Sequence, residues 1–231
     1  MERNSRVELV HRFFSGTGPS YDFMVNLCTL GFDRWWKKEI LEKIPEGSMR
    51  VLDQACGTGI LTSKIAQKLP LCRVVGVDVL EEYLNIAKEK AQRLRLENVE
   101  FILGKAEDVL LHQEFDCITS SYLAKYAELG DLIRNARKML RTGGVLIMHD
   151  FTYPSNHAFA CLWEFYFRIL QGAGKWEYPK WRAIFDGLPR LLRETKWVTE
   201  LVRFLKENTF SDINVRSLTL GTSAIVAAKK A

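Results

Sequence analysis

Two carboxylates and a glycine-rich loop have the residue types and the spacing of a ligand-binding site. Asp53 stands four residues before Gly57-Thr58-Gly59, and Asp78 follows 19 residues after Gly59. Small residues between a strand and a helix let the backbone approach a ligand closely, and the helix start offers unpaired amides. A carboxylate at the end of the next strand can accept both hydrogen bonds from a ribose diol. The pattern therefore predicts a ligand that contains a nucleoside.

The loop also distinguishes between two kinds of cofactor. A dinucleotide-binding loop requires G-x-G-x-x-G, and Thr62 occupies the position of its third glycine here. A loop that binds S-adenosylmethionine begins instead with an acidic residue on the first strand, where this chain has Asp53. A cofactor that carries an ammonium group and no phosphates would bind better to a loop with such an acid than to a loop that binds anions. We therefore expect S-adenosylmethionine as the cofactor.

The elements that must position these residues alternate between short apolar runs and longer amphipathic segments. The expected strands cover 49–53, 72–77, 99–103, 115–120 and 145–148, and the expected helices between them cover 61–69, 82–94 and 132–140. This alternation is typical of an α/β fold whose parallel sheet is buried on both faces. Two extended runs, 213–220 and 223–228, predict an antiparallel C-terminal edge strand on a mostly parallel sheet.

The expected organisation is one domain over residues 1–231 with helical additions at both ends of its core. Residues 1–45 are expected to form an N-terminal helical lid, and residues 46–150 the cofactor-binding core. The aromatic-rich segment 151–208 is expected to be a helical insertion after the fifth strand that caps the substrate. Residues 209–231 are expected to form the C-terminal strand pair.

Composition limits the classes of protein that the chain can represent. The chain has 231 residues, is 47% apolar and has a mean hydropathy of -0.10, values typical of a globular domain. We find no run long enough to span a membrane and no signal-peptide pattern, so we expect a cytoplasmic protein. None of the five cysteines forms a CxxC pair, and histidines and acids do not cluster at ligand spacing, so no metal site is expected.

The net charge of +5 lies in the last third of the chain, where many aromatic residues also lie. A basic, aromatic segment is compatible with peripheral contact at the inner membrane surface. It is equally compatible with a cap whose aromatic residues form its own core. Because acids are interleaved with the bases, no nucleic acid partner is expected. The oligomeric state stays open, and a homodimer is compatible with the sequence.

Several stretches resemble a known family. The loop motif, Asp78 and the turn at 141–144 resemble class I S-adenosylmethionine-dependent methyltransferases. The stretches that are similar to the ubiquinone/menaquinone C-methyltransferases within this class are 21–24, 30–31, 34–37, 116–119, 150–154 and 220–226. The resemblance implies a Rossmann-like sheet and C-methylation of a lipophilic aromatic such as a demethylated menaquinol or ubiquinol precursor.

The resemblance also implies cofactor contacts at matching positions. Thr58 falls at the loop contact, Asp78 at the ribose contact and Ala106 at an amide contact to the adenine. Tyr21 is expected to close over the methionine part of the cofactor. The full set expected to bind the cofactor is Tyr21, Asp53, Gly57, Thr58, Gly59, Asp78, Val79, Lys105, Ala106, Glu107 and Ser121.

Two positions depart from the family pattern. Lys105 stands where the family has asparagine or aspartate, and a lysine side chain can only donate hydrogen bonds. After the fourth strand the family has a stretch close to Phe-Gly-Leu-Arg-Asn, whereas residues 122–126 read Tyr-Leu-Ala-Lys-Tyr. Lys125 therefore takes the place of the arginine, and Tyr126 that of the asparagine.

Methylation of an aromatic carbon needs a base near a ring hydroxyl, because loss of that proton makes the carbon nucleophilic. The candidate catalytic residues are His149 and Asp150, at the carboxyl end of the fifth strand, and Lys125, as a base or as a cation that stabilises a phenolate. Neighbours on a strand point to opposite faces, so His149 and Asp150 are not expected to form a dyad. Two other functions stay open: O- or N-methylation of another small molecule, and cofactor binding as an accessory protein without transfer activity.

Overall fold

Short apolar runs of this chain pair into one seven-stranded sheet in the computed structural model, which describes residues 3–231. The strand order is β3-β2-β1-β4-β5-β7-β6. The strands are β1 (Arg50–Gln54), β2 (Arg73–Asp78), β3 (Val99–Leu103), β4 (Phe115–Ser121), β5 (Leu140–Phe151), β6 (Phe210–Leu218) and β7 (Ser223–Lys230). The central strands are buried along almost their whole length, which explains why they read as continuous apolar runs.

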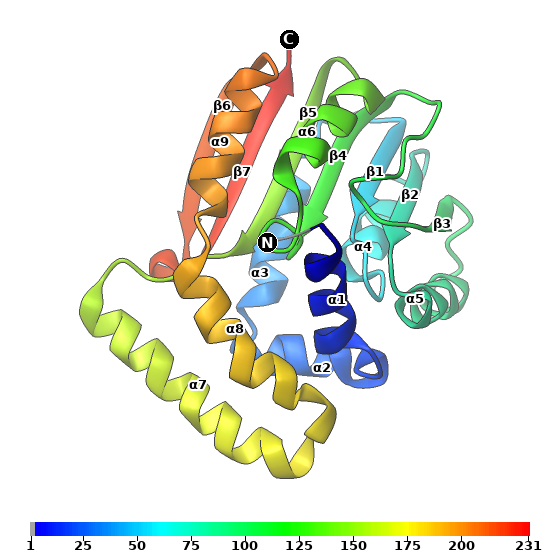
Figure 1. The fold of residues 1–231 in the computed structure, drawn as a ribbon. Coiled ribbons are helices and arrows are strands. Elements are labelled where there is room, and N and C mark those ends of the chain that lie inside the picture. The colour runs from blue at the N-terminus through cyan, green and yellow to red at the C-terminus, as the bar shows by residue number, and fades with distance from the viewer. Residues whose placement is uncertain (1–2) are drawn as a thin grey trace.

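The sheet is mostly parallel, as the sequence predicts. Strands β1 to β5 run parallel to their neighbours, whereas β7 runs antiparallel to both β5 and β6. The C-terminal pair is therefore a hairpin that adds the antiparallel part of the sheet, with β6 at the edge (Figure 1). The carboxyl ends of the parallel strands all lie at one end of the sheet, where sites gather in open α/β folds.

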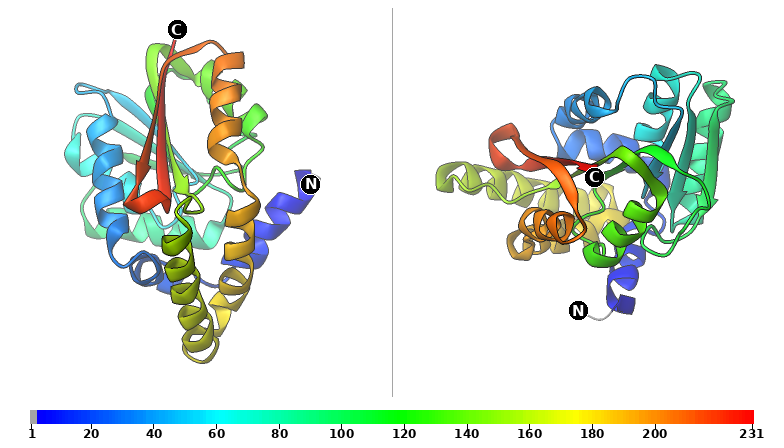
Figure 2. Two further views of the ribbon diagram at one scale, coloured as in Figure 1. Left: turned by 90° about the vertical axis from the view of Figure 1, so that its left-hand side faces the viewer. Right: turned by 90° about the horizontal axis from the view of Figure 1, so that it is seen from above.

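Helices cover both faces of this sheet (Figure 2). The helices are α1 (Arg3–Phe14), α2 (Gly18–Cys28), α3 (Phe32–Lys43), α4 (Ile60–Lys68), α5 (Glu81–Arg93), α6 (Leu129–Met139), α7 (His157–Glu177), α8 (Arg182–Glu194) and α9 (Trp197–Glu207), with 3-10 turns η1 (Pro179–Trp181) and η2 (Thr219–Gly221). Helices α3, α4 and α5 pack on one face, and α6 and α9 on the other. The chain is therefore a three-layer α/β fold.

A third apolar cluster lies beyond the carboxyl ends of the strands. It joins the N-terminal helices to α7 and α8 through buried side chains such as Phe13, Met24, Phe167 and Phe185. Helix α7 begins at a cap in which the Asn156 side chain accepts a hydrogen bond from the amide of Phe159 at 3.0 Å. Truncation of a buried aromatic such as Phe185 to alanine removes about 3–5 kcal/mol of stability. This cluster therefore anchors both helical additions over the sheet end.

The structure differs from the sequence-based expectation in the extent of one strand. Strand β5 runs over Leu140–Phe151 instead of 145–148, because residues of the expected turn join the strand across a register shift opposite Phe115. On α3, Trp36 takes the inward position and its neighbour Trp35 is exposed. Among the described residues, the helices are too short or too polar to cross a membrane.

Candidate active site

The glycine loop turns the chain from β1 into α4 through three residues with left-handed backbone, of which the first is Ala55, with a φ of +54°. Gly57 has a φ of +57° and Gly59 a φ of +75°, a region in which other residues are strained. A Cβ added at Gly59 would lie 3.0 Å from the Cβ of Ala87 on α5. Gly59 is not among the residues that line the three cavities described below, and its lack of a Cβ lets α5 pack closely against the loop.

Asp78 stands at the end of β2 and holds the loop in place. Its Oδ2 accepts a hydrogen bond from the amide of Gly57 at 2.8 Å, and its Oδ1 accepts one from the amide of Leu80 at 2.9 Å. Burial raises the pKa of Asp78 despite these two donors. A carboxylate offers about four acceptor positions, so two remain for a ribose diol.

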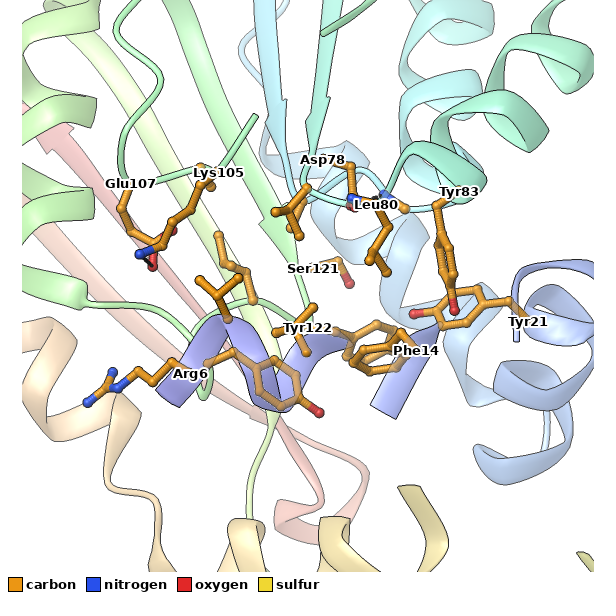
Figure 3. Close-up of a pocket in the computed structure, with 18 residues that line it drawn as sticks. Arg6, Phe14, Tyr21, Asp78, Leu80, Tyr83, Lys105, Glu107, Ser121 and Tyr122 are labelled. Carbon is orange, nitrogen blue, oxygen red and sulfur yellow. Dashed lines mark hydrogen bonds and ion pairs between the residues drawn. The ribbon is translucent and has the colours of Figure 1, made fainter. Parts of the chain in front are cut away.

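A cavity of about 760 Å³ opens beside Asp78. The predicted cofactor residues that line it are Tyr21, Gly57, Asp78, Val79, Lys105, Ala106, Glu107 and Ser121. Figure 3 shows Phe14 and Tyr21 on one side of this cavity, opposite Asp78 and Lys105. Lys105 Nζ lies 3.9 Å from Glu107 Oε1, so these two opposite charges sit together at the wall. Eight of the eleven residues expected to bind the cofactor thus come together around one cavity.

Sequence reasoning missed the residues of α1 that cover this cavity. Val7, Val10 and Phe14 line it from the helix, at the three- and four-residue spacing of one helical face. The aromatic ring of Tyr83 also lines it and meets the ring of Tyr21 edge-on at 5.1 Å. The periodic spacing of apolar residues in α1 could have pointed to these residues. Such spacing indicates a buried helix face, and it does not indicate that the face lines a cavity.

A smaller cavity of about 330 Å³ adjoins the first and shares five lining residues with it, Tyr21, Ala55, Gly57, Ser121 and Tyr122. Asp53 and Thr58 line it, together with Lys37, which the sequence analysis did not single out. Asp53 is buried and accepts hydrogen bonds from the Thr62 hydroxyl at 2.6 Å and the Thr119 hydroxyl at 3.0 Å. Burial raises the pKa of Asp53 to about 6. An ammonium group bound here would favour the charged carboxylate.

The loop is also connected to the N-terminal helices. The Thr58 hydroxyl donates a hydrogen bond to Asp22 Oδ1 at 2.5 Å, and Lys90 Nζ lies 2.6 Å from Asp22 Oδ2. Asp22 belongs to α2 and Lys90 to α5, so the contact connects three segments that are far apart in sequence. Thr58 therefore joins α2 to the cofactor loop in addition to lining the small cavity.

An apolar pocket of about 560 Å³ adjoins these cavities beneath α2, α7 and α8. Its walls are mostly aliphatic and aromatic, and Lys125 is the charged side chain among the lining residues that the structure describes. Tyr21 and Tyr122 line this pocket and both cavities beside the loop, so the three spaces meet at these two rings. Tyr122 has a φ of +70°, a strained conformation that occurs most often at functional sites.

Lys125 forms a buried ion pair with Asp150 at the edge of the apolar pocket. The distance from Lys125 Nζ to Asp150 Oδ1 is 2.5 Å, and the two side chains are 2% and 0% exposed. Lys125 Nζ also donates to the carbonyl of Tyr122 at 3.1 Å, and its ammonium lies 4.4 Å from the centre of the Tyr126 ring. Burial lowers the pKa of Lys125, although Asp150 opposes this effect.

His149 lines none of the three cavities, although the centre of its ring lies 5.1 Å from that of Tyr122. Its Nδ1 lies 2.9 Å from the Ser121 hydroxyl, and its Nε2 lies 2.6 Å from the Ser223 hydroxyl. Burial lowers the pKa of His149 well below its ordinary value, so the imidazole is neutral. The two neighbours on β5 have different partners, so His149 and Asp150 do not form a dyad, as the alternation of a strand predicts.

Two residues of α3 complete a polar network behind Tyr122. Lys37 Nζ donates to Asp33 Oδ1 at 2.9 Å and to the Ser121 hydroxyl at 2.7 Å. The Tyr122 hydroxyl donates to Asp33 Oδ1 at 2.6 Å. Both α3 side chains are buried, and Lys37 lowers the pKa of Asp33 against the effect of burial. The sequence feature that could have identified this network is an acid and a lysine four residues apart on one helix, next to the inward-facing Trp36.

Comparison with known proteins agrees with this geometry. A family model described as a methyltransferase domain matches residues 45–187, which is more than half of the chain. The chain is 25% identical over 227 residues to the demethylmenaquinone methyltransferase of Geobacillus stearothermophilus, which covers 96% of this chain and 97% of that protein. The protein of the same name from Listeria monocytogenes is 28% identical over 226 residues, with coverage of 95% and 94%.

The solved structures show the same fold. N-methyltransferase NodS from Bradyrhizobium japonicum, in complex with S-adenosyl-L-homocysteine, matches with a TM-score of 0.58 and 16% identity, over 86% of this chain and 87% of NodS. The residues around the loop suit this type of ligand, since Asp78 keeps acceptor positions for a ribose and Asp53 offers an acid for an ammonium. The chain therefore belongs to the methyltransferase-domain family and is an S-adenosylmethionine-dependent methyltransferase.

Proposed function

We propose that this enzyme methylates a ring carbon of a lipophilic quinol, such as a demethylated menaquinol or ubiquinol precursor. The observation that carries the proposal is the apolar pocket, which joins the cofactor cavities at Tyr21 and Tyr122 and contains one buried ion pair. An apolar wall suits an isoprenoid tail, and a single charged group at its inner end suits a ring hydroxyl. The names of the curated relatives support the same acceptor class.

The cofactor would be held by residues of the two cavities beside the loop. In this proposal Asp78 accepts the ribose hydroxyls, Asp53 binds the ammonium, and the backbone at Ala106 meets the adenine. Tyr21 closes over the methionine part from α2. The bound cofactor supplies an electrophilic methyl group, and the side chains position the acceptor ring and exclude water.

Lys125 is proposed to stabilise the oxygen anion of the acceptor ring. Its ammonium donates to Asp150 and to the Tyr122 carbonyl, and a lysine has three protons, so one remains for a phenolate oxygen. Asp150 positions this ammonium, and the apolar walls strengthen its attraction to a negative oxygen. The ring releases one proton for each methyl group that it gains. His149 is proposed to position Ser121 and has no proposed contact with the acceptor.

Acceptor specificity can be measured directly. The purified enzyme would be assayed with S-adenosylmethionine and a series of reduced quinols whose tails grow by one isoprene unit, beside catechol and amine acceptors of similar size. We expect kcat/KM to rise with tail length, because each buried methylene contributes about 0.8 kcal/mol. Turnover of the amines or catechols with no turnover of any quinol would contradict the proposal. Cofactor binding without turnover of any acceptor would identify an accessory protein instead.

The arrangement of the chain into functional segments is also a proposal. We propose a helical lid over 1–45, a cofactor-binding core over 46–150, a substrate cap over 151–208 and a C-terminal strand pair over 209–231. Helices α1 and α2 line the cavities, and α7 and α8 line the apolar pocket, which supports the lid and the cap. Helix α9 packs with α6 on the sheet, so the part of the cap beside the substrate would be α7 and α8.

We further propose that α2 and α7 dock on an anionic lipid surface. Leu162, Phe165 and Ile169 share one face of α7 and are 51–60% exposed. The Tyr166 hydroxyl donates to the carbonyl of Leu27 at 2.7 Å, which joins this face to the exposed apolar side of α2. Helix α7 lies in the last third of the chain, which carries the net charge of +5, and an apolar helix face in a basic segment is typical of interfacial binding. Docking would bring the apolar pocket to the membrane in which a long-tailed quinol resides.

Liposome sedimentation tests this docking face. Leu162→Ser/Phe165→Ser is expected to release the protein from vesicles that contain phosphatidylglycerol. Leu71→Ser is the matched control, because Leu71 is 84% exposed on the loop between α4 and β2. Equal sedimentation of all three proteins would overturn the proposal. A change of oligomeric state in the double variant, measured by light scattering, would instead identify this face as a contact between two copies of the chain.

A further inference from the structure

The small cavity beside the glycine loop carries one side chain of each charge. Among the described residues that line it, Lys37 and Asp53 are the charged ones, and the rest are polar or apolar. The amino-acid end of S-adenosylmethionine also carries one group of each charge, an ammonium and a carboxylate. We propose that Lys37 binds the carboxylate of the cofactor, opposite the ammonium site at Asp53.

The Lys37 ammonium has one proton free for this contact. A lysine has three donor protons, and Lys37 spends one on Asp33 and one on the Ser121 hydroxyl, at 2.9 Å and 2.7 Å. The side chain is almost fully buried, so solvent screens its charge little. These two bonds also fix its direction before the ligand arrives, which reduces the entropy that binding must remove.

The charges around Lys37 would be balanced by the two charged groups of the ligand. Asp33 pairs with Lys37 at 2.9 Å in the ligand-free protein, so the Lys37 ammonium would be shared between Asp33 and the cofactor carboxylate. Asp53 is held by two threonine hydroxyls, and the cofactor ammonium would offset its charge. The Lys37 ammonium lies 4.3 Å from the centre of the Tyr122 ring. Through this contact, Lys37 also helps to position the Tyr122 ring, which lines both cavities and the apolar pocket.

Other cations of the site face different spaces. Arg6 and Lys105 line the larger cavity beside Asp78, and Arg6 Nε pairs with Glu128 at 3.0 Å. Lys125 lines the apolar pocket and pairs with Asp150. None of these three residues lines the small cavity, so Lys37 is the cation that the described part of the chain places beside Asp53.

Binding measurements with two ligands test the assignment without any methyl acceptor. Calorimetry would compare S-adenosylmethionine with decarboxylated S-adenosylmethionine, which keeps the ammonium and lacks the carboxylate. Lys37→Met is expected to raise the Kd for S-adenosylmethionine about 10- to 100-fold, the usual effect of one charged hydrogen bond. The Kd for the decarboxylated ligand is expected to change less than about 3-fold. Lys38→Met is the matched control, because Lys38 points to solvent and pairs with Glu42 at 3.7 Å.

A second variant separates carboxylate binding from a purely structural role. Lys37→Met leaves Asp33 buried without its cation, so Lys37→Met/Asp33→Asn removes both charges together. The same ligand-specific loss is expected in the double variant. Equal weakening of both ligands would overturn the assignment in favour of a structural role, and an unchanged Kd for S-adenosylmethionine would overturn it outright. Because the test measures binding alone, its result is independent of the proposed quinol acceptor.

Discussion

Removal of the Lys125 cation should destabilise the protein strongly, because its partner stays buried. Asp150 is fully buried, and without Lys125 Nζ it would keep the backbone amides of Lys125 and Phe151, at 3.0 Å and 2.7 Å. Breaking a buried ion pair by removing one partner costs about 3–5 kcal/mol. For a chain of this size, each kcal/mol lowers the Tm by about 2–4 °C, so Lys125→Met should lower it by about 6–20 °C.

A double variant sharpens this prediction. Lys125→Met/Asp150→Leu removes both charges and should recover most of the stability. If Lys125 stabilises a phenolate as proposed, the double variant should still lack methyl transfer. Recovered stability without recovered activity would separate a catalytic role from a structural one.

The assay is calorimetric unfolding, with binding of S-adenosylmethionine as a check that the fold is intact. The control is Arg190→Met, because Arg190 and Glu194 form an exposed pair at 2.8 Å that should contribute little. A loss below about 1 kcal/mol for Lys125→Met would refute the reasoning about the buried pair. Full activity of the double variant would refute the role of Lys125 in the reaction.

Three further predictions follow from the loop and its carboxylates. Asp78→Asn should raise the Kd for S-adenosylmethionine about 10- to 100-fold by calorimetry, because a charged acceptor of the ribose is lost; an unchanged Kd would place the ribose elsewhere. The pKa of Asp53 is about 6, so affinity should rise as the pH increases through 6, and binding below that pH should release a proton; Asp53→Asn should abolish both effects. Gly59→Ala should lower the unfolding free energy by more than about 1 kcal/mol in urea, because of its positive φ and its contact with Ala87; equal stability would contradict the packing argument.

The sequence predicted those parts of the structure that depend on local patterns. The strand over 99–103 agrees with β3, and the loop residues lie around the cofactor cavity, because turn chemistry and strand ends are fixed within a few residues. Asp53 and Asp78 follow from the rule that carboxyl ends of parallel strands meet at one edge. The Rossmann-like fold class could be predicted for the same reason.

Contacts between distant segments could not be predicted in this way. Lys37 meets Ser121 across 84 positions of sequence, and no local pattern indicates that pairing. In α7 the apolar residues occupy two faces, so periodicity predicted a helix but did not decide which face packs inward. Phe167 and Leu170 are buried, whereas Leu162 and Ile169 are exposed. Packing against α2 and α8 decides between these faces, and that packing is a property of the whole fold.

The acceptor atom is the central claim, and an acceptor labelled with deuterium tests it most directly. A reduced demethylmenaquinol with deuterium at the free ring carbon would be incubated with the enzyme and S-adenosylmethionine, and the product analysed by mass spectrometry. C-methylation predicts the gain of one methyl group together with the loss of the ring deuterium. With Asp78→Asn at limiting cofactor, both changes should be about 10- to 100-fold smaller. A product that gains the methyl group and keeps the deuterium would show transfer to oxygen and contradict the proposal.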